Sequence, residues 1–285
     1  MNSVAFNYSF DKKLELNFKP ITRALENWPQ EINNTIKIIR KSTKKPLYLC
    51  MSGGIDSEVI ALKLIENNIK FTALIVRFKN NHNYHDIMVA QEFCKKYHID
   101  NHTVYLDMEE FCSNKIDRYI AEGYKAVRIF RYLQLFMLET IEHLGGCGII
   151  GSGEQVYCNV DGVLCLNRDF GHMMSLEWCK NNNTLHYPYF FEQNPELFAS
   201  YMKEELIDFL LQKPEYFINH IDNMSTEKIL IYHKYWPTMD RRFKFHGFEN
   251  ILKLKSETEK KLRDLFLNIV PTFFPIYEIK KQIKI

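Results

Sequence analysis

Six consecutive residues, Ser52-Gly-Gly-Ile-Asp-Ser57, bring hydroxyl, bare-backbone and carboxylate groups into one short stretch. An apolar run, residues 47–51, precedes them, and a stretch with helical spacing begins near Glu58. Adjacent glycines weaken both strands and helices, so this stretch must need backbone without side chains. N–H groups at the start of a helix, with serine hydroxyls beside them, suit phosphate. We therefore expect a strand, a phosphate-binding loop and a helix here.

Asp56 is the unusual member of this loop, because a carboxylate beside phosphate repels it unless a divalent cation lies between them. Mg²⁺ is the usual ion in such an arrangement. A second glycine-rich segment, Gly151-Ser-Gly-Glu154, follows another apolar run, and Glu154 is a candidate to share the ion with Asp56. The alternative, that Gly151 to Gly153 form only a tight turn, stays open.

The loop lacks the lysine that a Walker A motif places after its glycines. It resembles instead the S-G-G-x-D-S signature of the PP-loop ATP pyrophosphatases, which include asparagine, GMP and NAD synthetases and several tRNA-modifying enzymes. The resemblance covers about residues 45–155 and is nearest to the N-type, synthetase-like members. A second glycine motif, G-x-G-x-x-G over 146–151, straddles an apolar run instead of opening a helix, so we do not assign it to a dinucleotide.

This resemblance implies cleavage of ATP between the α and β phosphates, with an adenylate as intermediate. The pyrophosphate would be held by the loop, whose members are Ser52, Gly53, Gly54, Ile55 and Ser57, with Mg²⁺ on Asp56. The adenine would lie against the backbone at the end of the next strand, at Leu74 and Val76. Such sites act mainly by positioning and electrostatic stabilisation.

Basic side chains are expected to hold the remaining phosphate charge. Arg128 and Arg131 lie three residues apart on a predicted helix and therefore share a face. Lys244 lies in a second basic segment, DRRFKFHGFE, over 240–249. We name Asp56, Ser57, Arg128 and Lys244 as candidate catalytic residues. A solvated basic face is the alternative for each cation, and the aromatic residues beside Lys244 also leave contact with tRNA open.

Apolar runs and helical stretches alternate along the middle of the chain. We predict strands over 47–51, 71–78, 102–106 and 147–150, with helices over 55–67, 84–97 and, in two pieces broken near Gly123, 108–144. This rhythm predicts an α/β fold with a doubly wound, mostly parallel, Rossmann-like sheet. A hairpin and a helix over 21–41 would form residues 1–41, the PP-loop domain 42–192, and a helical C-terminal region 193–285.

Composition limits the classes of protein to consider. The 285 residues carry a net charge of +2, which argues against a protein that coats nucleic acid. No run is long enough for a membrane span, and the seven cysteines form no C-x-x-C pair, so we expect a cytoplasmic protein without an iron–sulfur cluster or structural zinc. We expect no N-terminal glutaminase domain, so an amide-forming member would take ammonia or an amine directly or from a partner chain.

Together these observations favour an AMP-forming, Mg²⁺- and ATP-dependent ligase that activates a carboxylate or carbonyl oxygen of a small-molecule acceptor for attack by nitrogen. One alternative is an enzyme that modifies a nucleobase or tRNA, including sulfur transfer through Cys50 or Cys158. A non-catalytic ATP-binding module is another, although the intact Asp56 argues against it. A homodimer is left open.

Overall fold

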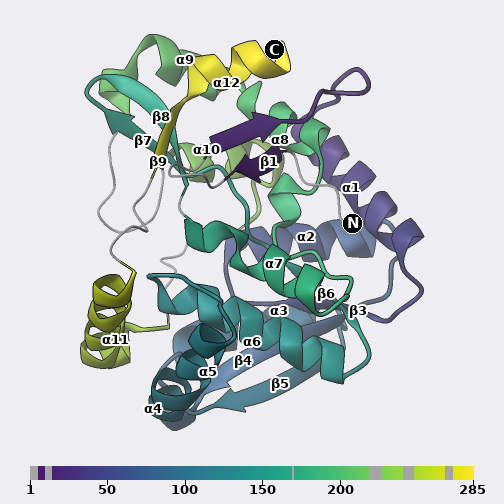
Figure 1. Cartoon of the computed structure of the whole chain (residues 1–285). Coiled ribbons are helices and arrows are strands. Elements are labelled where there is room, and N and C mark those ends of the chain that lie inside the picture. The colour runs from purple at the N-terminus through teal and green to yellow at the C-terminus, as the bar shows by residue number, and fades with distance from the viewer. Residues whose placement is uncertain (1–5, 10–14, 169, 218–225, 240–246, 267–271) are drawn as a thin grey trace.

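The computed structural model describes residues 6–9, 15–168, 170–217, 226–239, 247–266 and 272–285. A four-stranded parallel sheet lies in the lower half of Figure 1 and carries the first glycine-rich loop. The strand order is β5-β4-β3-β6. The strands are β3 (Leu47–Cys50), β4 (Thr72–Phe78), β5 (Asn101–Leu106) and β6 (Cys147–Ile150). All four predicted strands are confirmed, and each of their ends lies within one residue of the predicted position.

Helices cover both faces of this sheet, which confirms the predicted doubly wound α/β fold. Leu49 packs with the face formed by α1 (Trp28–Ser42), α2 (Ile55–Glu66) and α3 (Tyr84–Lys96). The next residue, Cys50, packs on the opposite side, because side chains alternate along a strand. That side is covered by α4 (Met108–Glu110), a π-helical turn (Phe111–Lys115), α5 (Ile116–Ala121), α6 (Ile129–His143) and α7 (Met174–Asn181).

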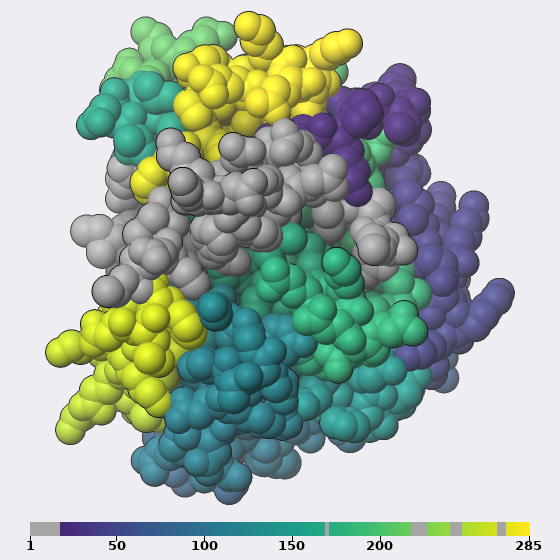
Figure 2. Space-filling view, viewed as in Figure 1, coloured from purple at the N-terminus to yellow at the C-terminus, as the bar shows by residue number. Residues whose placement is uncertain are grey.

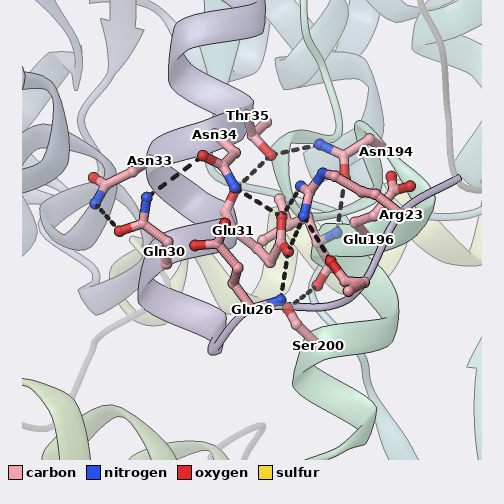
Figure 3. Close-up of polar contacts among 12 residues, drawn as sticks. Arg23, Glu26, Gln30, Glu31, Asn33, Asn34, Thr35, Asn194, Glu196 and Ser200 are labelled. Carbon is pink, nitrogen blue, oxygen red and sulfur yellow. Dashed lines mark hydrogen bonds and ion pairs between the residues drawn. The ribbon is translucent and has the colours of Figure 1, made fainter. Parts of the chain in front are cut away.

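The prediction of one helix over 21–41 is wrong at its start. Helix α1 begins at Trp28, because the Asn27 side chain accepts a hydrogen bond from the Gln30 N–H and Pro29 lies in the first turn. Proline suits that position, where its missing N–H costs nothing. Residues 22–26 instead form a polar cluster with α1 and α8 (Pro195–Met202), shown in Figure 3.

Glu31 is the centre of the cluster in Figure 3 and is fully buried. It forms an ion pair with Arg23 and accepts a hydrogen bond from the Glu26 N–H. Burial alone would raise the pKa of Glu31, but these partners outweigh it and lower the pKa below its ordinary value. Nearby, Thr22 donates to Glu196 of α8, so the segment before α1 is fastened to the C-terminal region.

A second, antiparallel sheet lies outside the central one and joins β7 (Tyr157–Val160), β8 (Val163–Arg168) and β9 (Thr272–Pro275). Strands β7 and β8 form a hairpin, and both Asp161 and Gly162 at its turn have positive φ. Strand β9 lies within the C-terminal region, whose other described regular elements are helical, as predicted. The other described elements are the hairpin of β1 (Phe6–Ser9) and β2 (Glu15–Phe18), with α9 (Glu205–Gln212), α10 (Thr226–Tyr235), α11 (Leu252–Leu265) and α12 (Ile276–Ile283).

Helix α11 lies at one side of the molecule against the segment that contains α4 to α6 (Figure 2). An ion pair between Lys261 and Asp117 joins α11 to α5. Within the described residues, no helix has the length and apolar character needed to cross a membrane.

Candidate functional site

The loop between β3 and α2 forms at the carboxyl edge of the sheet, where parallel α/β folds bind ligands. Gly54 is the N-cap of α2, and no side chain of the described residues caps this helix end. The Ser57 hydroxyl turns back and donates to the Gly54 carbonyl at 2.8 Å, whereas Ser52 is exposed. An N-terminus of this kind suits an anion.

Gly53 is required at its position for two reasons. Its φ is +69°, a conformation that L-residues with a side chain rarely adopt. A Cβ there would also lie 2.4 Å from the carbonyl oxygen of Asp86, in the first turn of α3. The loop is therefore pressed against the start of α3, and only glycine fits.

The second glycine-rich segment lies beside the first, because β6 pairs in parallel with β3 and their carboxyl ends meet. A Cβ on Gly151 would lie 3.2 Å from the backbone nitrogen of Ser57. Gly153 has a φ of +84° and a Cβ there would lie 3.0 Å from the Cβ of Tyr189. The segment is thus both a tight turn and a close neighbour of the start of α2.

Helix α10 brings two hydrogen-bond donors onto Asp56. The Lys228 Nζ lies 2.7 Å from Asp56 Oδ2, and the Tyr232 hydroxyl donates to Asp56 Oδ1 at 2.5 Å. Lys228 also lies 3.7 Å from Glu154 Oε1. Asp56 and Glu154 therefore flank one position, and an ammonium group occupies it.

Both donors hold their protons firmly. Burial lowers the pKa of Lys228, but the carboxylates of Asp56 and Glu154 outweigh burial and raise it above its ordinary value. Burial, and then the charge of Asp56, raise the pKa of Tyr232 well above its ordinary value. Sequence reasoning missed both residues. The one local signal was their spacing of four, which places them on one face of a helix.

The donor set fits a magnesium ion that phosphate oxygens help to coordinate. Mg²⁺ in nucleotide sites takes one or two protein carboxylates and fills its other positions with phosphate and water. Asp56 and Glu154 supply such a pair. In the described part of the chain, no group of three or more His, Cys, Asp or Glu side chains is placed to form an all-protein metal site.

A buried polar network lies behind the second loop. The Arg131 Nη2 lies 3.0 Å from His172 Nδ1, and His172 Nε2 lies 2.8 Å from Glu192 Oε2. Arg168 donates to the other oxygen of Glu192 and, at 3.2 Å, to the Glu154 carbonyl. The network therefore holds the loop that carries Glu154.

Burial and neighbouring charged groups together set the protonation states in this network. Burial, opposed by Glu192 and aided by Arg131, lowers the pKa of His172 to about 4. The ring is therefore neutral at pH 7, accepts from Arg131 at Nδ1 and donates to Glu192 at Nε2. Burial would raise the pKa of Glu192, but His172 and Arg168 bring it below its ordinary value. Arg131, predicted to hold phosphate, is 8% exposed and is a member of this network.

The other two predicted cations are placed differently. Arg128 is half exposed, and its Nη1 lies 3.6 Å from Glu259 Oε2 on α11. Glu259 also accepts a hydrogen bond from the Ile129 N–H, and so caps α6. Lys244 lies outside the described residues.

Backbone groups at the predicted adenine position in β4 already form hydrogen bonds within the protein. The Leu74 carbonyl accepts from the Met51 N–H at 2.9 Å. The Asn83 side chain donates to the Val76 carbonyl at 2.9 Å and accepts from the Phe78 N–H at 2.8 Å. A cavity of about 80 Å³ lies just beyond, and it is lined by His82, Asn83, His85, Asp86, Gly247, Glu249 and Asn250.

The central segment of the chain matches a known protein family. Residues 38–135 match the asparagine synthase family. No curated protein sequence gives a significant match. Among solved structures, the chain resembles NMN synthetase from Francisella tularensis at 13% identity, with a TM-score of 0.35 over 84% of this chain and 92% of that one.

Two further structures give similar values. A predicted subunit of tRNA methyltransferase from Methanocaldococcus jannaschii is 17% identical, with a TM-score of 0.36 over 71% of this chain and 93% of the other. An NH3-dependent NAD synthetase from Campylobacter jejuni is 15% identical, with a TM-score of 0.32 over 84% of this chain and 96% of the other.

The family match ends before Gly151, Glu154 and the whole of α10, so those parts of the site rest on the geometry alone. Over the segment it covers, it supports an ATP-utilising enzyme of the synthetase type and confirms the resemblance drawn from Ser52 to Ser57. Residues 38–135 therefore match the N-type, asparagine synthase side of the PP-loop ATP pyrophosphatase superfamily.

Proposed function

We propose that this protein is an AMP-forming ligase that cleaves ATP to AMP and pyrophosphate and joins nitrogen to an activated carboxylate or carbonyl carbon. One observation carries the proposal: Asp56 and Glu154 flank a cation position directly beside the N-terminus of α2, which no side chain of the described residues caps. A site that only bound ATP would not need two carboxylates next to its phosphates. We further propose that the catalytic unit is residues 42–192, completed by α10.

In the proposed reaction, the triphosphate lies across the first turn of α2, with Ser52, Gly53 and Gly54 around the pyrophosphate. Asp56 and Glu154 would hold Mg²⁺, which neutralises phosphate charge. An acceptor oxygen forms a bond to the α-phosphorus as the bond to pyrophosphate breaks. A nitrogen nucleophile, ammonia or an amine, then attacks the activated carbon, loses a proton and displaces AMP. The chain contributes mainly orientation and fixed charge.

Burial of Cys50 and Cys158 argues against sulfur transfer through either cysteine. Burial raises the pKa of the Cys50 thiol far above its ordinary value, and raises that of Cys158 to about 11. Both thiols are therefore protonated at neutral pH, and a thiol is a far weaker nucleophile than a thiolate. Modification of a nucleobase with nitrogen stays compatible with this site, so a nucleobase or tRNA is the second acceptor class that we propose to test.

The test is to identify the products formed from [α-³²P]ATP and Mg²⁺ in the presence of fractionated small metabolites or bulk tRNA. We expect labelled AMP, and pyrophosphate in equal amount, with one fraction. Asp56→Asn should lower turnover at least a hundredfold, because an amide supplies neither the charge nor the ion position.

Asp107→Asn is the matched control. Asp107 also follows a strand at the same edge of the sheet and caps the next helix, a role that asparagine keeps. This variant should retain full turnover. Labelled ADP would refute the proposed cleavage position, and tight ATP binding without products from any fraction would favour a binding module.

A further inference from the structure

The ammonium group of Lys228 occupies the position where the proposed function requires a divalent cation. We propose that Lys228 is an internal counter-cation, which holds the Asp56–Glu154 pair in the absence of nucleotide and is displaced when a divalent ion binds. This inference rests on the proposed nucleotide site and adds a competition between α10 and the metal.

The contacts of α10 engage both oxygens of Asp56. Lys228 is 2.7 Å from Oδ2 and Tyr232 is 2.5 Å from Oδ1. The same ammonium is 3.7 Å from Glu154, so it bridges the two carboxylates. A metal ion that binds Asp56 directly must replace at least one of these contacts.

Electrostatic repulsion disfavours binding of a divalent ion while the Lys228 ammonium stays in place. Asp56, Glu154 and Lys228 together carry a net charge of –1, and the buried Glu227 adds negative charge nearby. Asp56 is 16% and Lys228 19% exposed. A divalent ion added beside Lys228 would place two cations in contact. A divalent ion in place of Lys228 balances the pair of carboxylates.

The cavity beside Lys228 is too small to hold a hydrated ion. The cavity next to Lys228 has a volume of about 10 Å³, roughly enough for one water-sized particle. Its walls include the rings of Trp28, Phe191, Tyr201 and Tyr232. An ion with its shell of water therefore does not fit in this cavity, which Glu154 and Lys228 line.

Helix α10 holds Lys228 in place through apolar packing that is independent of the carboxylates. Tyr232 and Trp236 both pack edge-on against Trp28, at ring-centroid distances of 4.8 and 5.6 Å. Removing the charge of Lys228 should therefore leave the helix seated and only vacate the position.

The experiment measures Mn²⁺ binding to the full chain without nucleotide, with free Mn²⁺ counted by electron paramagnetic resonance. Lys228→Met should bind one Mn²⁺ at least tenfold more tightly than the wild type. Adding Asp56→Asn to that variant should abolish the gain. Tyr232→Phe, which frees one oxygen but keeps the ammonium, should tighten binding less than threefold.

Lys234→Met is the matched control, because Lys234 lies on the same helix and pairs with Glu204 at 2.9 Å, away from Asp56. It should bind Mn²⁺ as the wild type does. If Lys228→Met is not folded by circular dichroism, Lys228→Gln takes its place with the same expectation. Affinity within twofold of the wild type in a folded, neutral variant overturns the proposal. The Mn²⁺ titration contains no ATP, so its outcome does not depend on whether the protein forms AMP. A failure to form AMP in the separate product assay would refute the proposed function but not the proposal about Lys228.

Discussion

Replacing Gly53 by alanine tests whether the phosphate loop depends on close approach to α3. The change forces a side chain into a left-handed conformation, at φ of +69°, which costs about 1–2 kcal/mol. It also places a methyl group 2.4 Å from the Asp86 carbonyl oxygen, a backbone atom that cannot swing aside. Relieving such an overlap costs about 1–3 kcal/mol more. The sum is a loss of about 2–5 kcal/mol in the free energy of unfolding.

Gly145→Ala separates these two contributions. Gly145 has nearly the same φ, +70°, but among the described residues no heavy atom lies within 4 Å of the position of its added Cβ. Urea denaturation should show a loss of about 1–2 kcal/mol for Gly145→Ala, with ATP affinity unchanged in calorimetry. Gly53→Ala should lose more stability, and its ATP affinity should fall at least tenfold because the loop is displaced. Equal losses of stability in the two variants, with ATP affinity kept in both, would refute the reasoning.

Two other predictions concern buried polar groups near the site. The pKa of His172 is about 4 in the folded chain and near 6.5 when unfolded, so the unfolded chain binds the extra proton and stability falls as the pH drops from 6.5 to 4. The shift corresponds to about 3 kcal/mol in the free energy of unfolding. In urea denaturation, the free energy of unfolding of His172→Gln should depend less on pH over this interval than that of the wild type. An identical pH dependence in the two proteins would contradict the assignment. Asn83→Ala leaves the Phe78 N–H and the Val76 carbonyl without their partner, and should lower the free energy of unfolding in urea by about 2–4 kcal/mol. Asn182→Ala removes a hydrogen bond to the Trp178 carbonyl from an exposed side chain and should cost about 1 kcal/mol or less. Equal losses in the two variants would contradict the reasoning.

The central fold could be predicted because its determinants are local. The run from Leu47 to Met51, the glycines after it and the helical spacing that follows specify a strand, a loop and a helix within about twenty residues of sequence. Prediction failed locally at residues 21–27. The hydrophobic spacing pointed to a helix there, but the Asn27 cap and Pro29 set the start of α1 at Trp28, seven residues later than expected.

The surroundings of the loop could not be predicted, because their contacts join distant parts of the chain. Lys228 and Tyr232 meet Asp56 across 172 and 176 residues. What positions them is the packing of α10 on Trp28, and no spacing in the sequence reveals which buried rings will meet. Likewise, Arg131 lies on the predicted helix face, but its partner His172 belongs to a segment that carried no recognisable motif.

The pairing of β9 with β8 has a consequence for how the protein is made. The hairpin of β7 and β8 leaves the ribosome long before Thr272–Pro275, so its outer edge has no strand to pair with until translation has passed α10 and α11. The parallel sheet, whose last strand ends at Ile150, can assemble much earlier. During synthesis the nascent chain therefore carries a formed phosphate loop in which Asp56 still lacks Lys228. We expect this interval to be when the open hairpin edge is most exposed to pairing with other nascent chains.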